Sequence, residues 1–164
     1  EKWRNTRIPT LAEILQLSKG NIGIYLDLKE ADPSLIIKKI DEYQLRETIV
    51  WYIPASYGLV IQNILKNCPG CLVMPDPGPV KNLEKVMDQF QPKVIASDMG
   101  HLSRKFINKA HQKSVMVFVD DSENDLSKLK KEWKKMIRWG VDGIQTDEPE
   151  ALIEFLNMQK NRSS

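Results

Sequence analysis

Stretches typical of β-strands alternate with stretches typical of α-helices along almost the whole chain. Apolar or β-branched runs lie near residues 22–30, 48–53, 71–74, 93–97, 114–119 and 141–146, and each is followed by a segment with helical hydrophobic spacing. Strands separated by helices pair in parallel, because each helix returns the chain to the end at which the previous strand began. The alternation therefore predicts an α/β fold with six parallel strands.

Capping signals predict where several of the helices begin. Thr10 is followed by Glu13, which together form the pattern of a capping box. A longer helix that ends near Trp139 is expected to start after Ser122 or Asn124, since both side chains can accept hydrogen bonds from a first helical turn.

Acidic residues recur where the predicted strands end. Neither a Rossmann nor a P-loop glycine motif follows any strand, so the chain carries no signature of an open nucleotide-binding sheet. A closed barrel gathers the carboxyl ends of its strands on one rim, whereas an open sheet spreads them along a line. We therefore favour an α/β barrel. The acids concerned are Asp27, Asp76, Asp98, Asp120 and Asp147.

Asp27 and Lys29 form the most informative pair. Side chains alternate along a strand, so both residues are expected on one face, with Leu28 turned away. A carboxylate that binds a divalent cation, beside an ammonium that neutralises phosphoryl oxygens, suits a phosphate ester. A simple ion pair at the end of a barrel is the alternative.

The other polar residues on this rim have simpler interpretations. Asp147 is expected to cap the last helix, and Asp120 and Asp121 to accept hydrogen bonds in a turn. Asp76 lies in a proline-rich loop, where formation of a turn is its expected role. His101 is expected to be a solvated loop residue.

Composition excludes several classes of protein. With 164 residues, of which 41% are hydrophobic and 28% charged, the chain is expected to form one soluble domain. No apolar run approaches the roughly 20 residues of a membrane span, and no targeting segment is visible, so the compartment stays unassigned. The formal net charge of +2 gives no reason to expect nucleic acid as a partner.

The two cysteines, Cys68 and Cys71, have the spacing of a redox pair. They follow a predicted helix and lead into a strand, whereas thioredoxin-like pairs open a helix. We therefore expect a turn that contains two ordinary cysteines. One pair also supplies too few ligands for a structural zinc site.

The only concentrated basic stretch spans residues 128–138. Its apolar residues share one helical face and its lysines lie opposite. Such a helix can rest on an anionic membrane. An outer helix of a barrel has the same pattern, and that is the interpretation we favour.

Three stretches resemble the second half of the glycerophosphodiester phosphodiesterases. They are IPTLAEIL at residues 8–15, LDLKE at 26–30 and GVDGIQTDEP at 140–149, and they occur in the order of that family. The resemblance implies a TIM-type (β/α)8 barrel of which about the last six β/α units are present. Residues 1–164 would then form a single domain that lacks its amino-terminal strands.

The resemblance also implies roles for individual residues. Asp27 stands where the family has a glutamate that binds a divalent cation, Ca²⁺ or Mg²⁺, and Lys29 matches the lysine that contacts the substrate phosphate. Phe118 replaces a tryptophan of the pocket wall. The family's catalytic histidines belong to strands that would precede residue 1. We therefore expect no catalytic residue in this chain, since His101 and His111 lie elsewhere.

The parent protein is thus expected to hydrolyse glycerophosphodiesters, as small-molecule substrates, to glycerol phosphate and an alcohol. A non-catalytic binding or scaffold domain is one alternative, and a related phospholipase-type phosphodiesterase on the same barrel is another. The chain alone is expected to be inactive. It is also expected to self-associate or to be unstable, because an incomplete barrel exposes sheet edges.

Overall fold

A computed structural model describes residues 6–162 of the chain. Six strands alternate with helices, as the hydrophobic pattern predicts. The strands are β1 (Ile24–Asp27), β2 (Ile49–Pro54), β3 (Leu72–Asp76), β4 (Val94–Asp98), β5 (Met116–Asp120) and β6 (Gly143–Gln145). The helices are α1 (Leu11–Ser18), α2 (Pro33–Tyr43), α3 (Gly58–Asn67), α4 (Val80–Phe90), α5 (Arg104–Gln112), α6 (Leu126–Trp139) and α7 (Pro149–Arg162), with single 3-10 turns at Arg46–Thr48 and Ala55–Tyr57.

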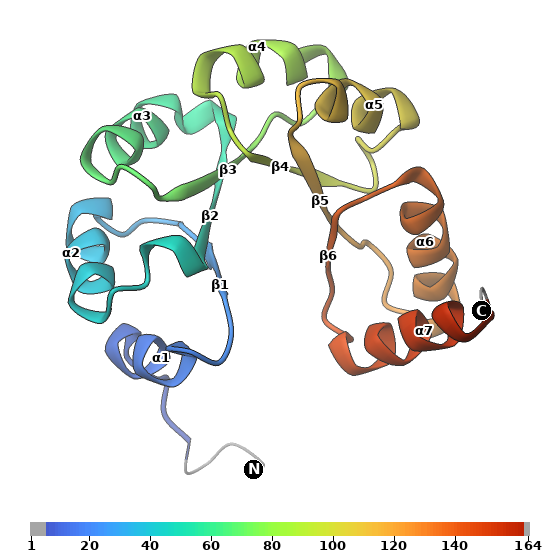
Figure 1. The fold of residues 1–164 in the computed structure, drawn as a ribbon, viewed down its shortest axis with the longest axis horizontal. Helices are drawn as coiled ribbons and strands as arrows, with labels where there is room; N and C mark the ends of the chain where they lie inside the picture. Colours follow the sequence, from blue (N-terminus) through green and yellow to red (C-terminus); the bar gives the residue numbers. More distant parts are fainter. Residues whose placement is uncertain (1–5, 163–164) are drawn as a thin grey trace.

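All of the strand pairs are parallel. They form two three-stranded sheets, ordered β1-β2-β3 and β4-β5-β6, and β3 lies beside β4 where the sheets meet. The strands follow one another along an arc with the helices on its outer side, and β1 and β6 stand at its two ends (Figure 1). The predicted α/β class and the parallel pairing are therefore confirmed.

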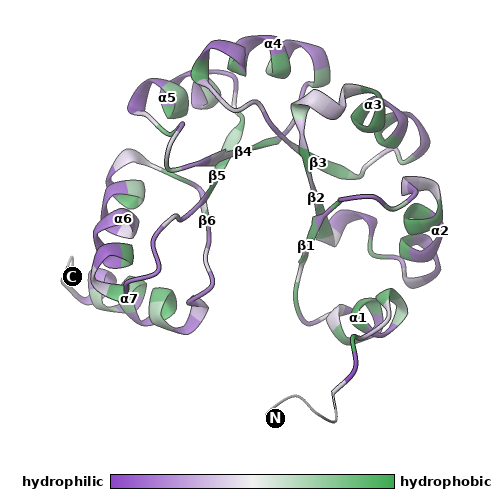
Figure 2. Cartoon of the chain, turned by 180° about the vertical axis from the view of Figure 1, so that it is seen from behind, coloured by the Kyte–Doolittle hydropathy of each residue, from purple (hydrophilic) through white to green (hydrophobic). Residues whose placement is uncertain are grey.

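The main core lies between the strands and the surrounding helices. Its largest fully buried side chains include Trp51 on β2, Phe106 on α5 and Trp133 on α6. Figure 2 shows helices that carry both hydrophobic and hydrophilic residues, as expected of helices that cover a sheet. A smaller apolar cluster of Met74, Val94 and Ala96 is separate from this core. It consists of strand residues only and supports the inner side of the arc.

The start of one helix follows its capping signal, and the start of another departs from it. The capping box of Thr10 and Glu13 is present, with both hydrogen bonds formed. The expectation for α6 is wrong, because its N-cap is Asp125, whose carboxylate accepts from the backbone N–H of Lys128 at 3.1 Å. Ser122 is occupied elsewhere: its hydroxyl donates to Glu132 at 2.8 Å. Helix α2 begins at Pro33, and the carboxylate of its N-cap Asp32 accepts from the backbone N–H of Ser34.

The strand that carries Asp27 is shorter and more exposed than the sequence suggests. β1 spans only Ile24–Asp27, and its residues alternate between half-buried and exposed. The reason is its position, since β1 pairs with β2 alone among the described strands. Although its sequence is mostly apolar, β1 is therefore a partly exposed strand at one end of the arc and not a fully buried one.

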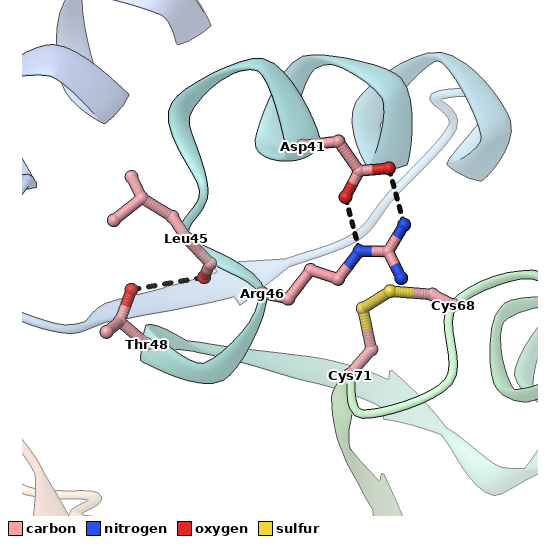
Figure 3. The surroundings of a disulfide bond; sticks show 6 residues. All are labelled: Asp41, Leu45, Arg46, Thr48, Cys68 and Cys71. Carbon is pink, nitrogen blue, oxygen red and sulfur yellow. Dashed lines mark hydrogen bonds and ion pairs between the residues drawn. A yellow bond between two sulfur atoms is a disulfide. The ribbon is translucent and has the colours of Figure 1, made fainter.

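The expectation of two ordinary cysteines is also wrong. Cys68 and Cys71 form a disulfide across the turn that joins α3 to β3 (Figure 3). The turn itself is as expected: the backbone N–H of Cys71 donates to the carbonyl of Cys68 at 3.0 Å. The pair lies near the ion pair of Arg46 with Asp41. The order of elements along the sequence predicts the turn, but it does not show that the two sulfur atoms are close enough to form a bond.

The basic stretch forms an outer helix, as favoured above. Leu129, Trp133 and Met136 of α6 are buried against the sheet, and its lysines face solvent or are half-buried. Among the residues that the structure describes, no helix is long and apolar enough to cross a bilayer.

Candidate functional site

A cavity of about 290 Å³ lies at the carboxyl ends of the strands. Every strand contributes to its wall, because parallel strands all end on the same side. The lining residues are Tyr25, Asp27, Lys29, Tyr52, Asp76, Ala96, Ser97, Asp98, Phe118, Val119, Asp120 and Gln145. Four of the five rim acids considered above therefore face one space, and Asp147 is the one that does not line it.

Asp27 and Lys29 meet on the wall of this cavity. The Lys29 ammonium lies 2.8 Å from a carboxylate oxygen of Asp27, and the side chains are 75% and 42% exposed. Leu28 between them is buried and extends the pairing with β2 through a 3.3 Å hydrogen bond to the carbonyl of Tyr52. The expected common face is thus present. Exposed ion pairs contribute little to stability, so a ligand can separate these two groups at small cost.

Two tyrosines form an aromatic wall next to this pair. The rings of Tyr25 and Tyr52 stack with centroids 5.8 Å apart, and the Tyr52 hydroxyl donates to Asp76 at 3.0 Å. Burial raises the pKa of both phenols, and the negative charge of neighbouring carboxylates, including Asp76 and Asp27, raises it further. Both hydroxyls therefore keep their protons at neutral pH and can donate hydrogen bonds to an anion.

Sequence reasoning missed this aromatic wall. The signal was available in part, since Tyr25 alternates with Asp27 along β1 and must share its face. Tyr52 is the register partner of Asp27 on β2. Only the register, which the sequence alone does not give, places the two rings side by side.

Negative charge accumulates on the opposite wall. Burial raises the pKa of Asp120, and the nearby carboxylates of Asp121, Asp147, Asp98 and Asp27 raise it further. Lys29 is the one basic side chain among the residues that line the cavity. This cavity is therefore a place where a bound cation or a proton would relieve repulsion.

Asp98 is engaged with His101, which was expected to be a solvated loop residue. The imidazole Nδ1 lies 2.7 Å from one carboxylate oxygen, and the backbone N–H of His101 donates to the other at 2.9 Å. Burial disfavours ionisation of Asp98, but these contacts outweigh it, so the pKa of Asp98 is lowered. A Cβ at Gly100 would lie 3.0 Å from Asp98, which explains glycine in this tight turn. His101 itself does not line the cavity.

Phe118 lines the cavity from β5, where the pocket wall was predicted. Its ring lies against β6 so closely that a Cβ on Gly143 would come within 2.7 Å of it. Gly143 therefore leaves the space that the ring fills. His111 lies on helix α5, and its Nε2 is 2.8 Å from a carboxylate oxygen of Asp142. The same oxygen accepts from the backbone N–H of Val117 at 2.8 Å, so this histidine supports the strand.

The cavity acids do not complete a metal site by themselves. In the part of the chain that the structure describes, no three His, Cys, Asp or Glu side chains are grouped so that they could hold one ion. Asp27 has its carboxylate next to an ammonium, and Asp76 accepts from both Tyr52 and the backbone of Gly78. A divalent cation would therefore need ligands beyond those grouped here.

Comparison with known families supports the resemblance found in the sequence. A sequence profile of the glycerophosphoryl diester phosphodiesterase family matches residues 73–151, so the resemblance to this family is confirmed. The matched segment begins in β3 and contains Phe118, whereas Asp27 and Lys29 lie outside it. None of the curated protein sequences matches the chain.

Solved structures are similar in fold. A glycerophosphoryl diester phosphodiesterase from Parabacteroides distasonis is 19% identical, with a TM-score of 0.76 over 94% of this chain and 57% of that chain. A glycerophosphodiester phosphodiesterase from Agrobacterium tumefaciens is 16% identical, with a TM-score of 0.70 over 88% of this chain and 61% of that one. At such identities the likeness shows a shared TIM-barrel-like α/β fold. The chain spans less than two thirds of either protein.

Proposed function

From the match to the glycerophosphoryl diester phosphodiesterase family over residues 73–151, we propose that this chain is part of a phosphodiesterase of that type. The parent protein would hydrolyse glycerophosphodiesters to glycerol phosphate and an alcohol. The observation that carries the proposal is the cavity on the strand carboxyl ends, in which one ammonium stands among carboxylates and phenols. That is the rim on which TIM-barrel enzymes build their active sites.

Residues 1–164 would form about the last six units of a (β/α)8 barrel, in a single domain that lacks its amino-terminal strands. The arc in Figure 1 supports this proposal, because β1 and β6 each pair with one neighbour and stand at its open ends. Two further β/α units between these ends would close the ring. Strands would then surround the cavity at this rim.

In the proposed site, Lys29 would bind the phosphate. Its ammonium is three-quarters exposed and already faces the cavity, so it can leave Asp27 for a phosphoryl oxygen. The protonated hydroxyl of Tyr25 would add a neutral hydrogen-bond donor from the same wall. Donors held in place before the substrate arrives stabilise the charge that develops on the phosphoryl oxygens. Phe118 would form the apolar side of the pocket.

Asp27 would supply one ligand to a divalent cation, Ca²⁺ or Mg²⁺, once Lys29 has turned to the phosphate. Such cations prefer carboxylate oxygens. The remaining ligands, and the histidines that act as acid and base in the family, would come from other parts of the parent protein. No histidine lines the cavity among the described residues. The chain alone is therefore proposed to be inactive.

A second candidate is a non-catalytic domain that binds a phosphodiester without hydrolysing it. It is favoured by two departures from the family pattern, since Asp27 stands in place of glutamate and Phe118 in place of tryptophan. A phospholipase-type phosphodiesterase on the same barrel is a third.

One assay separates the three. Full-length protein is incubated with glycerophosphocholine and a divalent cation, and the products are identified by phosphorus NMR. Release of glycerol phosphate without a cyclic intermediate supports the proposed hydrolase. A cyclic phosphate product indicates the phospholipase type, and binding without turnover indicates the non-catalytic domain.

A further inference from the structure

The solvent face of α6 concentrates positive charge more than any other described helix. The helix contains six basic residues and a single acid, Glu132. Residues three and four positions apart lie together on a helix, so the basic residues form two adjacent rows. One row contains Lys130, Lys134 and Arg138, and the other contains Lys131 and Lys135.

Most of these cations have no partner within the described chain, in contrast to lysines on other helices. Lys109 of α5 pairs with Glu84 of α4 at 2.5 Å, and Lys113, which follows the last residue of α5, pairs with Asp88 of α4. On α6, only Lys128 has an ion pair, with Glu123 at 3.4 Å, while Lys135 lies over the ring of Trp139. Within residues 6–162, no ion pair or hydrogen bond is formed by the side chains of Lys130, Lys131, Lys134 and Arg138, which we call the basic face.

Apolar side chains border the basic face. Leu126 and Ile137 remain 41% and 40% exposed, although other apolar residues of α6 are buried. By helical spacing, both lie next to the row of Lys130. Half-exposed apolar groups beside uncompensated cations are typical of helices that lie in the interface of a bilayer.

We propose that α6 is a docking surface for an anionic phospholipid bilayer. The lysines and Arg138 would meet the lipid headgroups, while Leu126 and Ile137 would reach the boundary of the acyl chains. Nucleic acid is less suitable as the partner, because these two apolar residues would then face a charged phosphate backbone. The proposal does not depend on the catalytic role of the cavity, since none of its residues lines that cavity.

The test measures co-sedimentation of the full-length protein with phosphatidylcholine vesicles, with and without phosphatidylserine. In the test variant, Lys130, Lys131, Lys134 and Arg138 are replaced by Gln. In the control, the same number of cations is removed from exposed, unpaired positions on other helices: Lys38, Lys66, Lys81 and Lys105. Because each cation near an anionic surface contributes about a fivefold gain in partitioning, the test variant should bind roughly a hundredfold or more weakly. Thermal melts of both variants check that folding is retained.

Binding of the unmodified protein should require phosphatidylserine, and it should weaken as salt shortens the range of electrostatic attraction. The control should bind like the unmodified protein. A double variant, Leu126→Ser with Ile137→Ser, should also bind more weakly. The proposal is overturned by absent binding to anionic vesicles or by an equal loss in the control. It is likewise overturned if a DNA duplex binds the basic face as tightly as the vesicles and the serine variant keeps its affinity.

Discussion

At the scale of single residues, the cavity depends on side chains that the strands bring together from distant parts of the sequence. Asp27 ends β1 and Lys29 lies two residues beyond it, and the period-2 alternation of an extended chain was enough to predict that the two side chains share a face. Tyr52, Asp98 and Asp120 join them through the parallel register of neighbouring strands. A site of this kind is only partly visible in sequence, since each strand contributes one or two residues.

The close approach of Phe118 to β6 predicts a strict requirement at Gly143. Gly143→Ala places a methyl group 2.7 Å from the ring, so the ring or the strand must move. We expect a loss of about 1–3 kcal/mol in the free energy of unfolding, measured by urea denaturation. Gly58→Ala is the control, because its new Cβ would be 3.5 Å from the nearest atom, an ordinary contact. Equal stability of the two variants would refute the close packing.

The Asp98–His101 contact predicts a dependence of stability on pH. The pKa of Asp98 is lowered in the folded protein, so its contribution to stability is present above the unfolded pKa, about 4. The contribution is lost as the pH falls through the lowered folded value. Because the pair is nearly half exposed, we expect Asp98→Asn to cost only about 0.5 kcal/mol at pH 7. Thermal melts of the two proteins should converge only once the pH is below the lowered folded pKa of Asp98, and a gap that does not shrink as the pH falls below about 4 would contradict this assignment.

At the scale of helices and strands, α6 shows how local signals can mislead. Ser122, Asn124 and Asp125 are all good N-cap residues, and sequence alone does not rank them. The structure selects Asp125, because Ser122 is held by Glu132 from the body of the helix. Strand and helix identity were predictable from hydrophobic period, whereas these ends depend on tertiary contacts.

The choice of cap can be measured. Asp125→Ala should reduce the free energy of unfolding by about 1 kcal/mol, since the first turn of α6 loses its acceptor. Asn124→Ala should change it by less than about half of that amount, because no cap bond depends on it. Urea denaturation of both variants tests the assignment. A larger loss of unfolding free energy for Asn124→Ala than for Asp125→Ala would instead identify Asn124 as the N-cap.

The disulfide at the end of α3 is a second local feature that could not be predicted from the sequence. It joins the C-cap of α3, Cys68, to Cys71, the residue directly before β3. A loop this short constrains the unfolded chain modestly, so the double variant Cys68→Ser with Cys71→Ser should lose about 2 kcal/mol. The difference should vanish when the unmodified protein is melted in a strong thiol reductant. A difference that survives reduction would mean that packing of the sulfur atoms matters more than the bond.

At the scale of the whole molecule, six parallel strands form an arc rather than a closed ring among the described residues. β1 and β6 each leave one edge without a strand neighbour, and exposed edges favour association. We expect residues 1–164, expressed alone, to self-associate and to show no phosphodiesterase activity. Sedimentation velocity over a range of concentrations tests the association. A stable monomer at high concentration would contradict it.

The role proposed for the cavity at the strand carboxyl ends is to bind a phosphodiester for cleavage, with Lys29 on the phosphate. The most direct test is the turnover of glycerophosphocholine by the full-length protein and its Lys29→Ala variant. Lys29→Ala should lose roughly a hundredfold in kcat/KM without a change in Tm. Lys38→Ala, an exposed lysine on α2, should retain full activity. Near-normal turnover by Lys29→Ala would contradict a role of Lys29 in binding the phosphate.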